Sequence, residues 1–278
     1  MRLGSHWESR GRGGKSSITA TVRACAVLTG IVLCGVSNAA ADDLCGATIV
    51  ANLKLDHDLT CAGDGLIVGA DGIRLNLNGH AISGSGSGVG ISVIGRTGVS
   101  IVGGTLRNFQ TGVLVLNSTA IQIRDNQFAG NVDGVDLQAG SVANTIKANH
   151  FQDHRTRGIM LRGGTSANVI KENTLSGNRV GILVNGPVGT TVKENTVSFS
   201  TLAGIRIGVT ATDNLIAENT VVSNPAGIDF IVTATESAIG NTLRENTIAL
   251  NTCGLKGPVA GNTLTENVFQ GNTFDSCP

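Results

Sequence analysis

The sequence has 278 residues, of which 39 are Gly, 4 are Pro, 7 are Phe, one is Trp and none is Tyr. Lys and Arg together number 20, as do Asp and Glu, so the formal net charge is zero. A duplex-binding protein needs a basic surface that displaces counterions, so this balance argues against nucleic acid as a partner. Because aromatic residues are scarce, we expect Val, Ile, Leu and Ala to fill the core.

Residues 1–41 have the pattern of a secretory signal peptide. Five basic residues precede a short apolar run at 24–36, and Ala39, Ala40 and Ala41 fit an A-x-A cleavage signal. The run is too short to span a bilayer as a helix. We predict a secreted or periplasmic protein whose mature domain is 42–278 and which keeps no stable membrane insertion after cleavage. An uncleaved membrane anchor is the alternative.

Four of the six cysteines follow the predicted cleavage site, with one close pair near each end of the mature chain. An even number of cysteines in an exported protein indicates disulfides. We therefore predict the bonds Cys45–Cys61 and Cys253–Cys277. The first would close an N-terminal cap over residues 42–60, and the second would pin the C-terminal end. Metal binding is the alternative for these cysteines, although the sequence contains no C-x-x-C.

Two short phrases recur along the chain with the same period. The pattern Gly-aliphatic-x-aliphatic begins at Gly90, Gly112, Gly134, Gly158, Gly181, Gly204 and Gly227. The second phrase, typified by "KENTV", places its Asn at Asn126, Asn149, Asn173, Asn195, Asn219, Asn246 and Asn267. Successive glycines differ by 22 to 24 positions and successive asparagines by 21 to 27. A fixed period in this range is typical of repeat architectures.

Each repeat contains about three short, β-branched segments interrupted by Gly and Asn, which disfavours helices. A short strand with one apolar face is not stable alone, but stacking each coil on the last buries that face and pairs the backbone groups. The sequence therefore predicts an all-β, single-domain, right-handed parallel β-helix of roughly nine coils. Asn tolerates the sharp turns between strands, and its amide can bond along the axis as a ladder. A second set of such residues is Asn131, Asn178, Asn224, Asn251 and Asn272.

With these repeats in place, the chain resembles the right-handed parallel β-helix proteins of the pectate-lyase-like superfamily, in particular exported bacterial proteins with generic β-helix repeats. The stretch "DLTCAGDGLIVGADGIRLNLNGHAISGSG" at 58–86 is similar to the entry coils of that group. The resemblance covers about residues 45–275 and implies the fold. It leaves the activity open, because this fold supports lyases, hydrolases, epimerases, adhesins and accessory proteins.

One two-coil cluster of charged residues is the candidate site for chemistry. Its members are Asp133, Asp136, Asp153, His154, Arg157 and Arg162. The carboxylates and the His could act as acid–base groups, and the two Arg could bind a substrate carboxylate. Asp133 and Arg157 hold the same place one coil apart, so ion pairs between coils are the competing interpretation. His80 is interpreted as a turn residue, and a metal site at His150, Asp153 and His154 as a minor alternative.

The outward position of the Gly-aliphatic-x-aliphatic phrase shows what one face of the helix would present. It reads Arg74, Ser92, Leu114, Asp136, Met160, Leu183, Arg206 and Asp229. This column has no run of carboxylates, so a calcium site is not expected there. Leu114, Met160 and Leu183 would instead form an exposed apolar strip of the kind that marks a partner surface.

Three functions follow from these features. The main prediction is an exported protein that binds a polysaccharide or another surface partner without catalysis. The first alternative is a polysaccharide hydrolase, lyase or epimerase that works at the cluster between Asp133 and Arg162. The second is a periplasmic accessory protein that handles a metal or a partner enzyme, for which resemblance to periplasmic β-helix proteins with a copper role is the basis. No cofactor is expected, and oligomeric state stays open.

Overall fold

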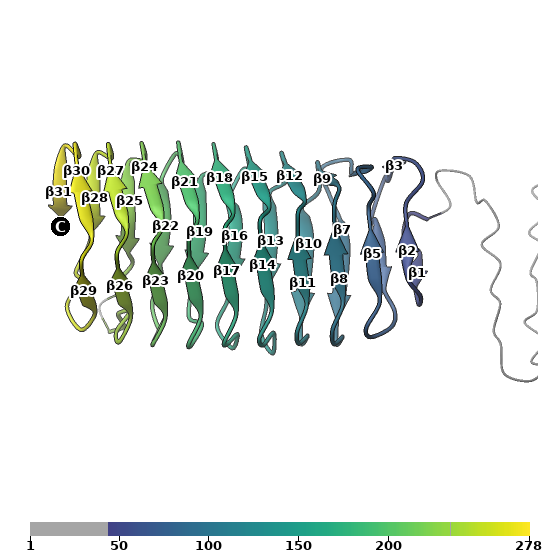
Figure 1. Cartoon of the computed structure of the whole chain (residues 1–278), viewed down its shortest axis with the longest axis horizontal. Helices are drawn as coiled ribbons and strands as arrows, with labels where there is room; N and C mark the ends of the chain where they lie inside the picture. Colours follow the sequence, from purple (N-terminus) through teal and green to yellow (C-terminus); the bar gives the residue numbers. More distant parts are fainter. Residues whose placement is uncertain (1–43, 234) are drawn as a thin grey trace, which may run out of the picture. The chain divides into compact units, whose positions relative to one another are not determined.

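The computed structural model describes residues 44–233 and 235–278. The predicted signal peptide therefore lies outside the described residues. The described residues form a parallel β-solenoid of about 10 turns, which confirms the expected right-handed parallel β-helix. Its coils stack in chain order (Figure 1). Within the described residues the only regular elements are strands, and none is a helix that could cross a membrane.

Each of ten coils contributes one strand to each of three parallel sheets, named here sheets A, B and C, and β31 adds an eleventh strand to sheet A. Sheet A contains β1 (Thr48–Ile49), β4 (Leu66–Val68), β7 (Val89–Ile94), β10 (Thr111–Leu116), β13 (Asp133–Leu137), β16 (Arg157–Leu161), β19 (Val180–Val184), β22 (Ala203–Ile207), β25 (Ala226–Phe230), β28 (Cys253–Lys256) and β31 (Phe274–Cys277). Sheet B contains β2 (Leu53–Lys54), β5 (Arg74–Asn76), β8 (Ser100–Val102), β11 (Gln122–Arg124), β14 (Thr145–Lys147), β17 (Val169–Lys171), β20 (Thr191–Lys193), β23 (Leu215–Ala217), β26 (Thr242–Arg244) and β29 (Thr263–Thr265). Sheet C contains β3 (Leu59–Thr60), β6 (Ala81–Ser83), β9 (Thr105–Arg107), β12 (Gln127–Ala129), β15 (His150–Gln152), β18 (Thr174–Ser176), β21 (Thr196–Ser198), β24 (Thr220–Val222), β27 (Thr247–Ala249) and β30 (Val268–Gln270).

The core is a set of aliphatic columns that run along the axis. Each three-residue strand of sheet B turns its middle residue inward, as Ile123, Ile146 and Ile170 do in neighbouring coils. Sheet C adds one aromatic step, where the rings of Phe128 and Phe151 stack with centroids 4.7 Å apart. The prediction of an aliphatic core is confirmed. Because every inward residue packs on its counterparts one coil away, burial of these side chains also fixes the register of the strands.

Asn ladders hold the corners between sheets, as the recurring "KENTV" phrase predicts. At the corner from sheet B to sheet C, the Oδ1 atom of Asn173 accepts the backbone N–H of Asn149 at 3.0 Å and the Nδ2–H of the same residue at 3.1 Å. The left-handed turn, however, belongs to the residue before each Asn, such as Glu172 with φ 56°. A third ladder, which the sequence did not reveal, contains Asn144, Asn168, Asn214, Asn241 and Asn262.

The described part of the predicted N-terminal cap, residues 44–60, forms the first coil, and its capping role stays a prediction. It supplies β1, β2 and β3, one strand for each sheet. This coil lacks the Gly and Asn phrases. The predicted disulfides are both present: Cys45–Cys61 with a Cα separation of 5.5 Å and Cys253–Cys277 with 6.1 Å.

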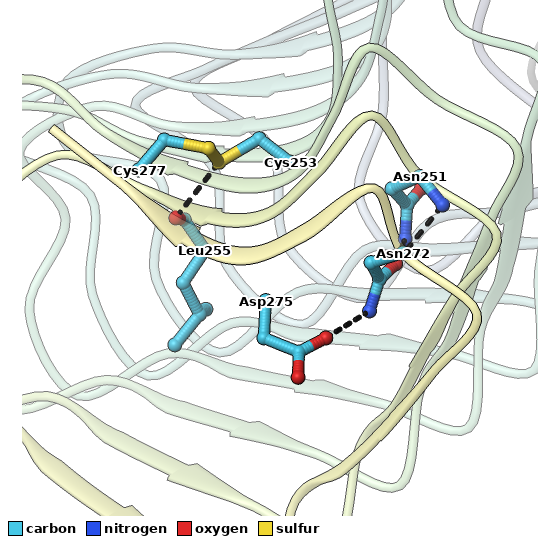
Figure 2. The surroundings of a disulfide bond; sticks show 6 residues. All are labelled: Asn251, Cys253, Leu255, Asn272, Asp275 and Cys277. Carbon is cyan, nitrogen blue, oxygen red and sulfur yellow. Dashed lines mark hydrogen bonds between the residues drawn. A yellow bond between two sulfur atoms is a disulfide. The ribbon is translucent and has the colours of Figure 1, made fainter.

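The second disulfide lies in the last coil (Figure 2). Cys253 stands in register with Phe274. Its sulfur forms the disulfide with Cys277 and lies 3.0 Å from the carbonyl oxygen of Leu255. Beside it the Asn ladder continues from Asn251 to Asn272. The bond therefore fastens the last strand of sheet A to the coil before it.

Candidate functional site

The two aspartates of the predicted site lie on the outer face of sheet A, on β13, and each is paired with an Arg of the next coil. Asp136 has only 3% of its surface exposed. The Nε atom of Arg162 donates to both of its oxygens, at 3.0 and 3.1 Å, and Nη2 donates to Oδ2 at 2.9 Å. Gln138 adds a further bond to Oδ2 at 2.9 Å. These hydrogen bonds raise the pKa of the Arg162 guanidinium above its usual value.

Asp133 is also paired with residues of the next coil. Its Oδ1 atom accepts a short hydrogen bond from the hydroxyl of Thr156 and lies 3.4 Å from Nη1 of Arg157. Arg157 stands directly above Asp133 in the register of sheet A, as the sequence spacing predicts. Both carboxylates are thus committed to cross-coil pairs. The geometry agrees with the competing interpretation, in which these charges join neighbouring coils.

The structure places Asp153 and His154 at the corner between sheets C and A, away from a common site with the aspartates. Asp153 takes the left-handed conformation, with φ 56°, and its exposed carboxylate accepts a bond from Gln152 at 3.1 Å. This is the conformation that Asn, Asp and Gly tolerate best. Asp153 is therefore a turn residue with an exposed side chain, whereas the side chain of His154 is buried.

His154 is an internal member of an Asn ladder. Its Nδ1 atom accepts the backbone N–H of Asn131 at 3.1 Å, and its own N–H donates to Oδ1 of Asn178 at 3.0 Å. Only 2% of its surface is exposed, and burial lowers its pKa from 6.5 to about 4. The imidazole is therefore neutral at neutral pH, with the proton on Nε2. No partner for Nε2 exists among the described residues. A side chain sealed in this way has no access to a substrate.

The predicted exposed apolar strip on sheet A is wrong in part. Met160 and Leu183 follow Asp136 in register, but they are only 4% and 7% exposed. They pack with Val180, Leu202 and Ile231 in a small cluster outside the main core. Side chains in one column are only about 4.8 Å apart, so they cover one another. Arg74 does not belong to this column, because it lies on β5 of sheet B and Ile67 takes the expected place.

A copper or other metal centre finds no suitable donor set in residues 44–233 and 235–278. No three His, Cys, Asp or Glu side chains converge there. The four described cysteines form disulfides, which removes them as thiolate ligands. Met160 and His154 are both buried, and Nδ1 of His80 bonds to Asp58 at 3.1 Å. The hydrogen bond from the backbone N–H of Ala81, and after it the bond to His80, lower the pKa of Asp58.

A feature that sequence reasoning missed lies along the corner from sheet C to sheet A. From the third coil on, each coil places a residue with positive φ directly after its sheet C strand: Asn108, Gly130, Asp153, Gly177, Phe199, Ser223, Leu250 and Gly271. Two members break the rule that such positions hold small or polar residues, and both are largely exposed, Phe199 at 66% and Leu250 at 65%. Alignment of the repeats at this corner would have revealed them.

The neighbouring face of sheet C carries no charge over four coils. Its outward positions form two columns on β18, β21, β24 and β27: Thr174, Thr196, Thr220 and Thr247 in one, and Ser176, Ser198, Val222 and Ala249 in the other. We call these eight residues, together with Phe199 and Leu250, the sheet C face. It is a regular array of hydroxyl and methyl groups with two exposed apolar side chains along one border.

Comparison with known proteins gives the family. A family model described as periplasmic copper-binding protein (NosD) matches residues 64–276. The chain belongs to the NosD family. A periplasmic location of this family and two disulfides agree with the predicted export. No curated protein matches this NosD-family sequence significantly.

Solved structures of low sequence identity share the fold of this NosD-family protein. An alginate lyase from Paenibacillus sp. strain FPU-7 is 18% identical, with a TM-score of 0.58, over 81% of this chain and 90% of its own. The periplasmic alginate epimerase AlgG is also 18% identical, with a TM-score of 0.55 over 81% and 64%. The A-module of Azotobacter vinelandii mannuronan C-5 epimerase AlgE6 is 16% identical, with a TM-score of 0.54 over 80% and 69%. At these identities the likeness concerns the β-helix fold alone.

Proposed function

We propose that this NosD-family protein is an exported, non-catalytic scaffold that binds a polysaccharide through the sheet C face. The exposed Phe199 at a left-handed corner is the observation that carries the proposal. A non-glycine residue in this conformation costs about 1–2 kcal/mol, and an exposed ring gains nothing from burial. Small residues occupy the same place in most other coils, so a large apolar one is best explained by contact with a ligand.

The chemistry of the face suits sugars better than charged partners. Thr and Ser hydroxyls both donate and accept hydrogen bonds, as sugar hydroxyls do. The four Thr of one column recur once per coil, at about the strand spacing of 4.8 Å, which offers a long polymer repeated contacts. The aromatic ring of Phe199 adds an apolar surface against which a sugar ring can stack.

The absence of a free acid–base pair in the candidate cluster supports the non-catalytic part. Asp133 and Asp136 are held by Arg157 and Arg162, and His154 is sealed inside. A glycosidase needs one carboxyl group that can donate a proton and one that can reach the sugar. The arrangement of the described residues therefore favours binding over the alternative of a hydrolase, lyase or epimerase at this cluster.

The test is a polysaccharide panel on the mature protein, with binding and product release scored together. It contains neutral glucans, pectate and alginate. We expect binding of a neutral polymer without product release. We also expect about a tenfold loss in affinity for Phe199→Ser, because stacking of an aromatic ring contributes up to about 1.5 kcal/mol beyond the burial of its area. Val188→Ser, which changes an exposed apolar residue at a different corner, is the matched control.

Two outcomes would contradict this proposal. Product release that disappears in Asp136→Ala would restore the enzyme alternative. Binding that is equal in the Phe199→Ser and Val188→Ser variants would remove the sheet C face from the interaction.

A further inference from the structure

A second surface feature lies on the outer side of sheet B, in the first two coils. It is a concavity of about 320 Å³ lined by Asn52, Leu53, Lys54, Arg74 and Asn76. These residues come from β2, β5 and the residue before β2, and Lys54 stands in register with Asn76. We call this feature the sheet B pocket. Its volume falls at the small end of ligand sites, which are about 300–1,000 Å³, so it suits a molecule of monosaccharide size.

The polar groups left available in the sheet B pocket are hydrogen-bond donors. The Oδ1 atom of Asn52 already accepts the backbone N–H of Arg74 at 2.8 Å. The Oδ1 atom of Asn76 likewise accepts the N–H of Asn78 at 3.0 Å. Neither Nδ2 group donates a hydrogen bond to the described residues, and Lys and Arg side chains have donors only. A site built in this way recognises an acceptor that carries no protons to donate.

The charge of the pocket is also uncompensated within residues 44–233 and 235–278. Neither Lys54 nor Arg74 forms an ion pair there, whereas the cations of later coils on the same face, such as Lys147, Lys171 and Lys193, each pair with a Glu. The next coil places Ser100 beside Arg74 in register, a neutral neighbour. The cations of the first two coils thus differ from the paired lysines of β14, β17 and β20.

We propose that the sheet B pocket binds a carboxylate or phosphate group carried by a sugar-sized molecule. The planar guanidinium of Arg74 can hold two oxygens of such a group, and the ammonium of Lys54 adds a second charge. The two Asn amides then bind remaining oxygens. This anion site lies on a different sheet from the proposed polysaccharide surface and does not depend on it.

Three probes with one ring test the chemistry: glucose, glucuronate and glucose 6-phosphate. They differ only at C6, so they compare a hydroxyl, a carboxylate and a phosphate in one shape. Binding to the mature, disulfide-intact protein is measured by calorimetry and by the NMR signals of the Asn52 and Asn76 side-chain amides. We expect both anions to bind with a Kd on the order of 1 mM or lower, to shift those amides, and to weaken with added salt. Glucose should not bind at this site.

Two variants locate the site, and a third controls for general charge. Arg74→Gln and Lys54→Gln should each weaken anion binding about tenfold, the effect of one lost charge-assisted contact. Both side chains are exposed, so neither change should affect folding, which circular dichroism checks. Lys193→Gln removes an equal charge from an ion-paired position of the same sheet and should leave binding unchanged.

The anion could belong to a free small molecule or to one residue of a polyanion, and binding of oligogalacturonate distinguishes these two sources. Tighter binding than glucuronate, lost in Arg74→Gln, would assign the pocket to one residue of a polyanion, and equal binding would assign it to a free small molecule. The proposal is overturned if glucose binds as well as the anions, if no anion shifts the amides, or if Lys193→Gln weakens binding as much as Arg74→Gln.

Discussion

At the scale of single residues, His154 shows how a polar residue can look catalytic in sequence and be structural in the fold. It follows Asn131 by 23 positions and precedes Asn178 by 24, so it replaces one Asn of the ladder at the corner from sheet C to sheet A. Thr190 and Ser200 replace an Asn at other ladder positions, and each has a buried hydroxyl without a partner among the described residues. Three of the six buried polar atoms without a partner in the described residues thus lie where the ladders are interrupted.

Replacement of His154 by Asn should remove a pH dependence of stability. The folded-state pKa of about 4 lies below the unfolded value of 6.5, so only the unfolded chain takes up the proton between these values. His154 therefore lowers the free energy of unfolding as pH falls. This loss is absent above pH 6.5 and reaches roughly 3 kcal/mol near pH 4, at about 1.36 kcal/mol per pKa unit. His154→Asn should therefore unfold at a higher temperature than wild type at pH 4.5.

The measurement is the unfolding temperature of both proteins between pH 4 and 8. His150→Asn, which changes the exposed His of the same coil, should keep the pH dependence of the wild type. A difference between His154→Asn and wild type that stays constant over this range would show that His154 titrates normally.

At the scale of elements, the register of the strands decides what the charged residues do. The repeat spacing correctly predicted that Arg157 would stand above Asp133, because a β-helix stacks equivalent positions directly. The burial of Met160 and Leu183 could not be predicted in the same way. It depends on how side chains on the outer face lean over one another, and the alternation of a strand specifies only the face.

Removal of Arg162 should lower the free energy of unfolding, because it leaves the buried Asp136 carboxylate without its charged partner. Arg162→Met keeps the stem of the side chain but leaves Asp136 with Gln138 as its one remaining side-chain donor among the described residues. We expect a loss of about 2 kcal/mol in the free energy of unfolding, since breaking a buried pair leaves an uncompensated charge.

The control is Arg124→Met, whose partner Asp125 is exposed. Surface pairs of this kind contribute about 0–1 kcal/mol, so this change should be nearly neutral by urea unfolding. Equal losses in the two variants would mean that the Asp136–Arg162 pair is solvated like the surface pair and has no special role in joining β13 and β16.

At the scale of the whole molecule, stability in a solenoid is a sum over neighbouring coils, and the ends are the weakest points. The disulfide Cys253–Cys277 holds the last strand, β31, whose residues are mostly exposed. Replacement of both cysteines by Ser should therefore increase amide exchange in residues 253–277 without changing exchange in the central coils. Hydrogen exchange followed by mass spectrometry measures this directly, with the double variant of Cys45 and Cys61 as the opposite-end control. Uniformly faster exchange would show that the end bond stabilises the fold as a unit.

The NosD family is described as copper-binding, but the described residues of this chain contain no set of side chains suited to copper. Copper ions bind imidazole, thiolate and thioether groups, but here the cysteines are bonded to each other, Met160 is buried and His154 faces the core. The mature, disulfide-intact protein should therefore show no stoichiometric copper binding in calorimetry or competition with a chelating dye, for either oxidation state. Reduction of the disulfides is the positive control, because it releases four thiols that bind Cu(I). Tight binding to the oxidised protein, abolished by His150→Ala or His57→Ala, would instead place a copper site on the exposed imidazoles and would favour the accessory role over the proposed scaffold.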